Sequence, residues 1–129
     1  MKTVVFTSAA TNYLPKARNL CPPIPPHHPE GESALPLAAG HGGAVDFSVE
    51  PIDEVLPIDQ LDIPDRERWS YFHTIVELST AIKPFVLKQL LARPDVERVL
   101  YFDPDMVLFS RLDDLLESLD KGNIVLTPH

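Results

Sequence analysis

Short apolar runs separated by stretches with helical spacing are the feature that most constrains how this chain can fold. Residues 3–7 form one such run and residues 99–102 another, the second at the end of a strand expected at 96–102, and both are rich in β-branched or aromatic residues. A short, continuous apolar run is typical of a strand that is buried on both faces. Because such strands alternate here with helical segments, we expect an α/β fold with a mostly parallel sheet flanked by helices.

The remaining elements are predicted from spacing, caps and helix breakers. Helices are expected at residues 13–20 with Asn12 as N-cap, at 66–82, at 83–93 and at 112–119. Further short strands are expected at residues 44–49, 55–58 and 123–126. On the helix at 66–82, the side chains expected to be buried are those of Trp69, Phe72, Ile75, Val76 and Ser79.

Proline is abundant and unevenly placed. Seven of the fourteen prolines lie between Pro15 and Pro36, and each one removes a backbone donor and disfavours the helical turn before it. From Cys21 to Gly43 the chain is rich in proline, glycine and alanine. We therefore expect residues 21–43 to form a loop or a disordered insertion.

The charge of the chain limits its partners. Its formal net charge is -8 at pH 7 with no basic cluster, which excludes nucleic acid and anionic membranes as main partners. No stretch approaches the roughly 18 apolar residues of a membrane span, and the single cysteine, Cys21, fits a reducing compartment. We expect a cytoplasmic protein. An acidic protein can still bind a phosphorylated ligand when a metal ion offsets the repulsion.

An acidic pair follows the second buried run. Asp103 and Asp105 flank Pro104 directly after the apolar residues 99–102. In extended backbone, residues i and i+2 point to the same face, so both carboxylates are expected to reach one cation. Mg²⁺ and Mn²⁺ prefer oxygen ligands and keep substrate phosphates as further ligands. The pair predicts a metal site for a diphosphate, and it also suits a solvated turn.

Several segments resemble, in order and at matching spacing, the GT-A-fold glycosyltransferases, in particular the glycogenin and lipopolysaccharide galactosyltransferase-like group, family 8. Residues 99–109 resemble the metal-binding Asp-x-Asp segment of that group. The other matching segments are residues 4–7, 12–17, 77–85, 112–115 and 124–129. The resemblance implies a Rossmann-like GT-A fold and the transfer of a sugar from a nucleotide diphosphate sugar, a UDP-sugar in the first place.

The resemblance implies a role for two acidic residues and one lysine. Asp103 and Asp105 would bind Mn²⁺ or Mg²⁺, which would neutralise the diphosphate leaving group. Lys83 would approach the diphosphate. The alternative for Lys83 is a solvated lysine at a helix end.

The resemblance also implies a nucleotide pocket near the first strand. Thr7 would meet the nucleobase or the ribose, mainly through its backbone. Asn12 and Tyr13 would shape the pocket, with Tyr13 stacked on the base. The structural alternatives are a plain helix cap for Asn12 and ordinary first-turn packing for Tyr13.

One region departs from the resemblance. Relatives carry a continuous helix after the first strand, whereas residues 21–26 here are Cys-Pro-Pro-Ile-Pro-Pro. Relatives then carry an apolar second strand, but residues 33–39 have Pro36 at their centre, which suits an edge strand only. His27 and His28 are adjacent and have no third ligand at fitting spacing, so we expect a structural or solvated role for them.

The chain ends at His129, directly after the last predicted strand, and we expect it to be the N-terminal portion of a longer protein. Residues 1–129 would then form the nucleotide-sugar-binding part of a single, incomplete GT-A domain. Catalysis is expected of the full-length metal-dependent hexosyltransferase and not of these residues alone. The acceptor would be bound by residues further along the chain.

Two other functions fit the same residues. The segment from Asp103 to Leu108 also satisfies the motif of haloacid-dehalogenase-type phosphatases, in which Asp103 would be the nucleophile and Asp105 the general acid. That motif usually opens its domain, whereas here most of the chain precedes it. The second alternative is a nucleotide-binding protein without catalysis.

Overall fold

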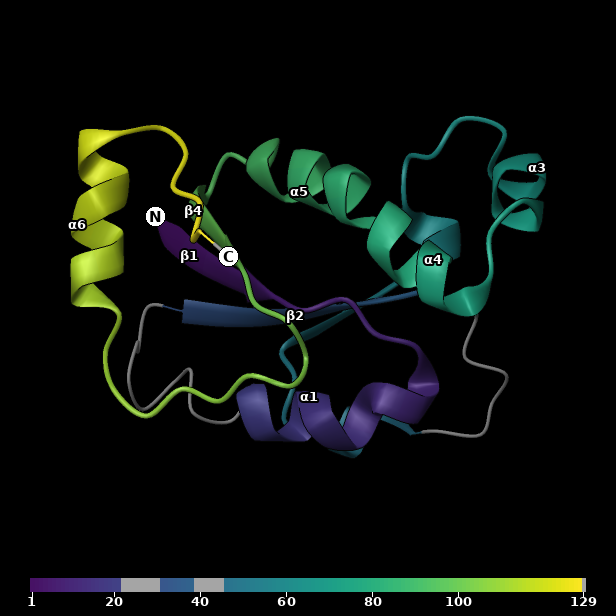
Figure 1. The fold of residues 1–129 in the computed structure, drawn as a ribbon, viewed down its shortest axis with the longest axis horizontal. Helices are drawn as coiled ribbons and strands as arrows, with labels where there is room; N and C mark the ends of the chain where they lie inside the picture. The colour runs from purple at the N-terminus through teal and green to yellow at the C-terminus, as the bar shows by residue number, and fades with distance from the viewer. Residues whose placement is uncertain (22–30, 39–45, 129) are drawn as a thin grey trace.

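The computed structural model describes residues 1–21, 31–38 and 46–128, and a four-stranded sheet runs through its centre (Figure 1). The strands are β1 (Lys2–Phe6), β2 (Gly31–Leu37), β3 (Glu54–Pro57) and β4 (Val96–Tyr101), in the order β3-β2-β1-β4. All three pairings are parallel. The predicted α/β class with a parallel sheet is confirmed, and so are the strands predicted near residues 3–7, 55–58 and 96–102.

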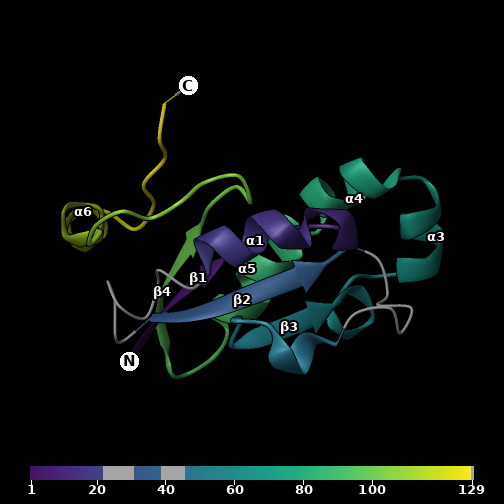
Figure 2. The same cartoon turned by 90° about the horizontal axis from the view of Figure 1, so that it is seen from below.

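Helices cover both faces of the sheet, as Figure 2 shows. On one face lie α4 (Ile75–Ala81) and α5 (Lys83–Leu91), with α3 (Arg66–Tyr71) beyond α4. On the other face lies α1 (Leu14–Leu20), and α6 (Asp113–Lys121) joins it beside β4. The helices predicted at residues 13–20, 83–93 and 112–119 are thereby confirmed. None of the described helices has the length and apolar character needed to cross a membrane.

Alternation along β1 separates two cores. Val4 and Phe6 belong to the cluster covered by α4 and α5, whereas Val5 belongs to the cluster that contains Leu20 of α1 and Leu100 of β4. Full burial of such a side chain contributes about 1.5–3 kcal/mol. Burial on both faces explains why β1 reads as a continuous apolar run.

An ion pair and two buried side chains hold α5 on the sheet. Arg93, just after α5, donates two hydrogen bonds to the carboxylate of Glu54 in β3, at 2.7 and 2.8 Å. Val86 and Leu90 of α5 are fully buried beneath the helix. These contacts fix the axis of α5, and with it the place of its first residue, Lys83.

β2 corrects the prediction for residues 21–43. A loop or a disordered insertion was expected there, but residues 31–37 form a strand that pairs with both β1 and β3. Leu35 and Leu37 are fully buried, and this burial outweighs the weak local signal of the sequence. The expectations for residues 22–30, His27 and His28 included, fall outside the residues that the structure describes.

Pro36 lies in an interior strand and not at the edge that its type suggested. Its carbonyl oxygen accepts a hydrogen bond from Ala9 N at 3.3 Å. This contact lies beyond Phe6, the last residue of β1. Because the N–H and C=O of one extended residue point to the same side, the donor that proline lacks would face the segment after β1, where an isolated bridge between Ala9 and Leu37 continues the pairing.

The helix predicted at residues 66–82 is two helices. α3 ends at Tyr71, and α4 begins at Ile75 with Thr74 as its N-cap. The hydroxyl of Thr74 accepts a hydrogen bond from Glu77 N, and the carboxylate of Glu77 accepts one from Thr74 N. This capping box starts a new helix and so ends the predicted one early.

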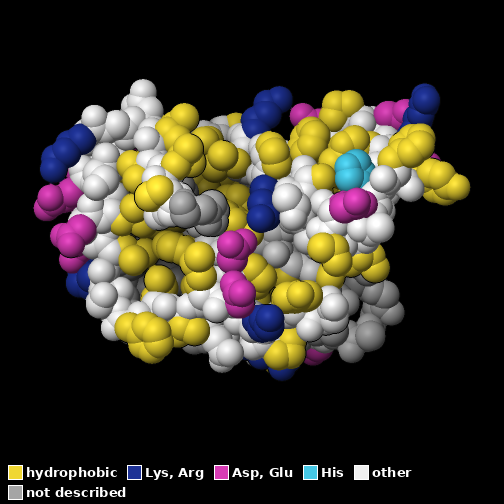
Figure 3. All heavy atoms as spheres, viewed as in Figure 1, with side chains coloured by type: hydrophobic (Ala, Val, Ile, Leu, Met, Phe, Trp, Pro, Cys, Tyr) yellow, Lys and Arg dark blue, Asp and Glu magenta, His cyan; other side chains and the backbone are white. Residues whose placement is uncertain are grey.

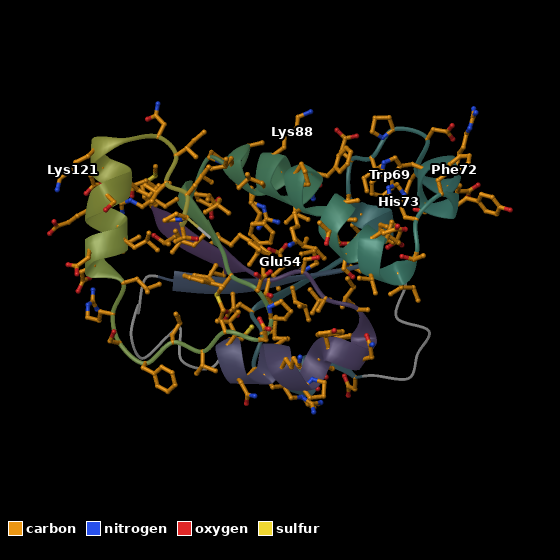
Figure 4. All side chains as sticks on the ribbon, viewed as in Figure 1. Glu54, Trp69, Phe72, His73, Lys88 and Lys121 are labelled. Atoms are coloured by element: carbon orange, nitrogen blue, oxygen red, sulfur yellow. The ribbon has the colours of Figure 1, made fainter. Side chains whose placement is uncertain are left out.

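The break also changes which side chains are buried. Phe72, Ile75 and Val76 were expected in the core, but they are 70%, 57% and 75% exposed. Figure 4 shows Phe72 directed away from the body of the molecule, whereas Trp69 and His73 lie against each other. The buried residue of α4 is Leu78.

Two of the other predicted strands are wrong. Phe47–Val49 forms a short 3₁₀ helix, in which Asp46 accepts a hydrogen bond from Ser48 N; residues 44 and 45 lie outside the described part of the chain. Residues 123–126 adopt neither helix nor strand. Within the described residues no strand pairs with the outer edge of β4, so this apolar segment has no ladder to join.

Candidate functional site

Three chain segments meet at the carboxyl-terminal edge of the sheet. Because β1 and β4 are neighbouring parallel strands, the segments after Phe6 and after Tyr101 leave the sheet side by side. α5 runs back across the sheet before β4 begins, which places Lys83 at the same edge. In open α/β sheets, ligands bind outside this edge. A pocket lies there, lined by Ser8, Ala9, Ala10, Asn12, Tyr13, Ile75, Val76, Ser79, Thr80, Lys83, Tyr101, Asp103 and Pro104.

Lys83, Tyr101 and Asp103 form one wall of the pocket. The hydroxyl of Tyr101 donates to Asp103 Oδ1 at 2.6 Å. The ammonium of Lys83 lies 3.7 Å from the same oxygen and 4.2 Å from the centroid of the Tyr101 ring. The ring itself packs on Phe6, with centroids 5.1 Å apart. This lysine–tyrosine–aspartate cluster is therefore fixed to the ends of both central strands.

The cluster leaves Asp103 available to a further cation. Burial, and then the hydrogen bond to Asp103, raise the pKa of Tyr101 well above its ordinary value, so the phenol remains a proton donor at neutral pH. The Asp103 side chain is 49% exposed, and the Lys83 side chain is 28% exposed. A half-exposed carboxylate with one lysine beside it can be reached from solvent.

The segment between β1 and α1 forms the opposite wall. Tyr13 is 41% exposed, and the ammonium of Lys16 lies 4.8 Å from its ring centroid. Asn12 belongs to a short 3₁₀ helix, and the N-cap position of α1 is Tyr13, without a side-chain cap. Asn12 as the cap of α1 is therefore a wrong prediction. Both Asn12 and Tyr13 line the pocket.

α4 closes the pocket with polar and apolar groups. The hydroxyl of Ser8 donates to the carbonyl oxygen of Ser79, which ties the segment after β1 to α4. Ile75 and Val76 supply an exposed apolar rim. The cavity volume is about 170 Å³, below the 300–1,000 Å³ common for whole ligands. It suits one part of an extended ligand, the rest of which lies across the open mouth.

The acidic pair does not adopt the predicted extended geometry. Met106 N donates to the carbonyl oxygen of Asp103 at 3.1 Å, which closes a four-residue turn over Pro104 and Asp105. Asp103 lines the main pocket, whereas Asp105 lines a smaller hollow with Lys16 and Asn19 of α1. Alternation along a strand does not apply inside a turn, so the expectation that both carboxylates share one face on that ground is corrected.

Thr7 lies beneath the pocket and not in its lining. Its side chain is buried, and its backbone N–H donates to the carbonyl oxygen of Ala34 at 3.3 Å. Among the described residues, its hydroxyl oxygen has no hydrogen-bond partner. The structure thus brings Asn12, Tyr13, Lys83 and Asp103 around one pocket, and it places Thr7 and Asp105 outside that lining.

The carboxylates fit a divalent cation that is shared with a ligand. Figure 3 shows acidic side chains near the middle of this face with Lys or Arg side chains beside them. In the described part of the chain, no group of three or more His, Cys, Asp or Glu gathers. An ion held by one or two carboxylates keeps waters and substrate phosphates as its other ligands. Asp103, which lines the main pocket, therefore fits such an ion, whereas the described residues do not form a closed structural metal site.

Several lining residues were missed from the sequence. Tyr101 had a usable signal, because a strand residue two positions before Asp103 shares its side of the strand. Ser8 follows a buried strand at the edge where ligands bind. Ile75 and Val76 had been placed in the core, and only the break between α3 and α4 brings them to the rim.

Comparison with protein-family profiles, with curated proteins and with solved structures gave no match.

Proposed function

We propose that this chain forms the nucleotide-sugar-binding part of a metal-dependent glycosyltransferase of the GT-A type. The observation that carries the proposal is the neighbourhood of Lys83 and Asp103 in a pocket at the carboxyl edge of β1 and β4. A divalent cation held by a carboxylate beside a lysine would give a diphosphate two positively charged centres, the ion and the ammonium. The exposed ring of Tyr13 on the opposite wall offers a surface for a base.

Each group has a separate task in this proposal. Asp103 would hold Mn²⁺ or Mg²⁺, and Asp105, two residues on and exposed, would supply a second carboxylate or hold a water ligand. When bound, the ion would neutralise the charge of the leaving diphosphate. Lys83 would bind the diphosphate oxygens, and Tyr13 and Asn12 would orient the nucleoside. Ser8, bonded to Ser79, would keep the two sides of the pocket at a fixed separation.

The charge of the chain favours a metal-linked ligand. At a net charge of -8, a free diphosphate is repelled over most of the surface. A divalent ion on Asp103 would reverse the local sign beside Lys83. The proposal thus requires that nucleotide binding depend on the ion.

Calorimetric titration with UDP tests the proposal. In Mn²⁺ the protein should bind UDP, and in excess EDTA the affinity should fall by about tenfold or more, since even groups behind a metal ligand are worth about 10–100-fold. Asp103→Asn keeps the shape of the side chain and removes its charge, so it should cause a loss of the same size. Asp114→Asn makes the same charge change on an exposed residue of α6 and should have no effect. Equal UDP affinity with Mn²⁺ and with EDTA would refute the proposed function.

A further inference from the structure

Lys83 occupies the place beside Asp103 that a bound cation needs. Its ammonium is 3.7 Å from Asp103 Oδ1, a separation at which the two charges attract without a close hydrogen bond. The same oxygen already accepts the hydrogen bond from Tyr101 at 2.6 Å. A cation that binds this oxygen must therefore share it with the Tyr101 hydroxyl and must approach the ammonium.

A divalent ion bound to Asp103 Oδ1 would repel the ammonium of Lys83, which lies 3.7 Å from the same oxygen. Like charges that share one carboxylate disfavour each other, because each removes part of the negative charge that stabilises the other. The Tyr101 ring gives the ammonium a second favourable contact, 4.2 Å from the ring centroid. The lysine can thus give up Asp103 and remain over the tyrosine, at the mouth of the pocket.

We propose that Lys83 is the internal counter-ion of Asp103, and that a divalent cation exchanges with it at this carboxylate and releases the ammonium toward the diphosphate. This inference rests on the proposed function and adds a coupling to it. The cation opposes Lys83 when it binds alone. In the presence of a diphosphate, the released ammonium gains a new anionic partner, so the cation and the nucleotide bind cooperatively.

The two binding steps are linked by thermodynamics. If Mn²⁺ raises the affinity for UDP by some factor, UDP raises the affinity for Mn²⁺ by the same factor. Removing Lys83 should reduce that factor, whether it is measured on the affinity for UDP or on the affinity for Mn²⁺. It should strengthen Mn²⁺ binding in the absence of UDP and weaken UDP binding in the presence of Mn²⁺. If Lys83 had a purely structural role, its removal would weaken both Mn²⁺ binding without UDP and UDP binding in Mn²⁺.

Paired titrations of the full chain measure these opposite signs. Mn²⁺ binding without nucleotide is followed by the loss of the free-ion electron paramagnetic resonance signal, and UDP binding in Mn²⁺ by calorimetry. For Lys83→Met we expect Mn²⁺ affinity to rise about two- to fivefold, the range of a partly exposed ion pair. UDP affinity in Mn²⁺ should fall by at least the same factor. Lys83→Arg keeps the charge. Its Mn²⁺ affinity without nucleotide should therefore not rise, and its UDP affinity in Mn²⁺ should not fall, as they do in Lys83→Met.

A matched control separates the exchange from a change in net charge. Lys88 lies on the same helix, is exposed and points away from the sheet (Figure 4). Lys88→Met removes the same charge and should leave both affinities unchanged.

An Mn²⁺ affinity for Lys83→Met that is equal to or lower than the wild-type value overturns the exchange, even where the wild type binds UDP in Mn²⁺. A wild-type protein that binds Mn²⁺ and no UDP overturns the proposed function and, with it, the release of Lys83 toward a diphosphate.

Discussion

At the scale of single residues, Thr7 carries a buried polar atom that the described part of the chain leaves without a hydrogen bond. Its side chain is 1% exposed, and its hydroxyl has no partner among the described residues. An unpaired buried hydroxyl costs about 1–3 kcal/mol in proteins. Thr7→Val keeps the branched shape and should raise the free energy of unfolding by about 1 kcal/mol. Urea denaturation measures this change.

Ser33 supplies the opposite case for comparison with Thr7. It is equally buried, but its hydroxyl donates to Asp53 Oδ2 at 2.6 Å and accepts from Asp53 N at 3.0 Å. Ser33→Ala should therefore lower the free energy of unfolding, since bonds to charged groups are worth about 1.5–3 kcal/mol.

A loss of stability in Thr7→Val would show that the Thr7 hydroxyl has a hydrogen-bond partner, and the explanation given for Thr7 would be wrong.

The sequence allowed part of the pocket to be predicted residue by residue. Asp103 was expected near a diphosphate from its place after an apolar run, and Lys83 was expected there from the family resemblance; the structure places the two side chains 3.7 Å apart. Asp105 was placed by strand alternation, which fails because the strand ends at Tyr101 and a turn follows. A turn of this kind depends on local backbone contacts that residue spacing does not specify.

At the scale of elements, the capping box between α3 and α4 decides the shape of the pocket rim. The apolar residues of both helices fit one continuous helical period, so spacing alone merged them into one helix over residues 66–82. The pair Thr74 and Glu77 has the spacing of a capping box and was the sequence signal for the break. Because α4 starts there, Ile75 and Val76 face the pocket and not the core.

The same cap gives a prediction for the stability of α4. Thr74→Ala removes the side-chain oxygen that accepts from Glu77 N and should lower the free energy of unfolding by about 1 kcal/mol. Thr80→Ala changes an exposed threonine inside the same helix and should be neutral or slightly stabilising, because alanine is the better helix former by about 0.5 kcal/mol. Equal losses in the two variants, measured by urea denaturation, would mean that the cap does not set the start of α4.

At the scale of the whole molecule, the parallel sheet followed from a few strong segments. β1 and the end of β4 are short, strongly apolar runs, and α5 between β3 and β4 has a buried face, so a parallel crossover was the natural arrangement. β2 was missed because its proline and small residues give a weak local signal, and its place depends on pairing with β1 and β3. The place of β2 in the sheet thus depends on contacts between segments distant in sequence, which local patterns do not reveal.

Residues 123–128 provide a prediction at this scale. Ile124 and Leu126 are 80% and 83% exposed, so ending the chain after Gly122 removes apolar surface that is not buried on folding. The free energy of unfolding should change by less than about 0.5 kcal/mol, as for changes away from packed sites. Leu20→Ala, at a fully buried position of α1, should cost about 2–5 kcal/mol in the same urea titration. A loss after truncation that approaches the Leu20→Ala value would mean that residues 123–128 pack against the domain in solution, and it would contradict this prediction.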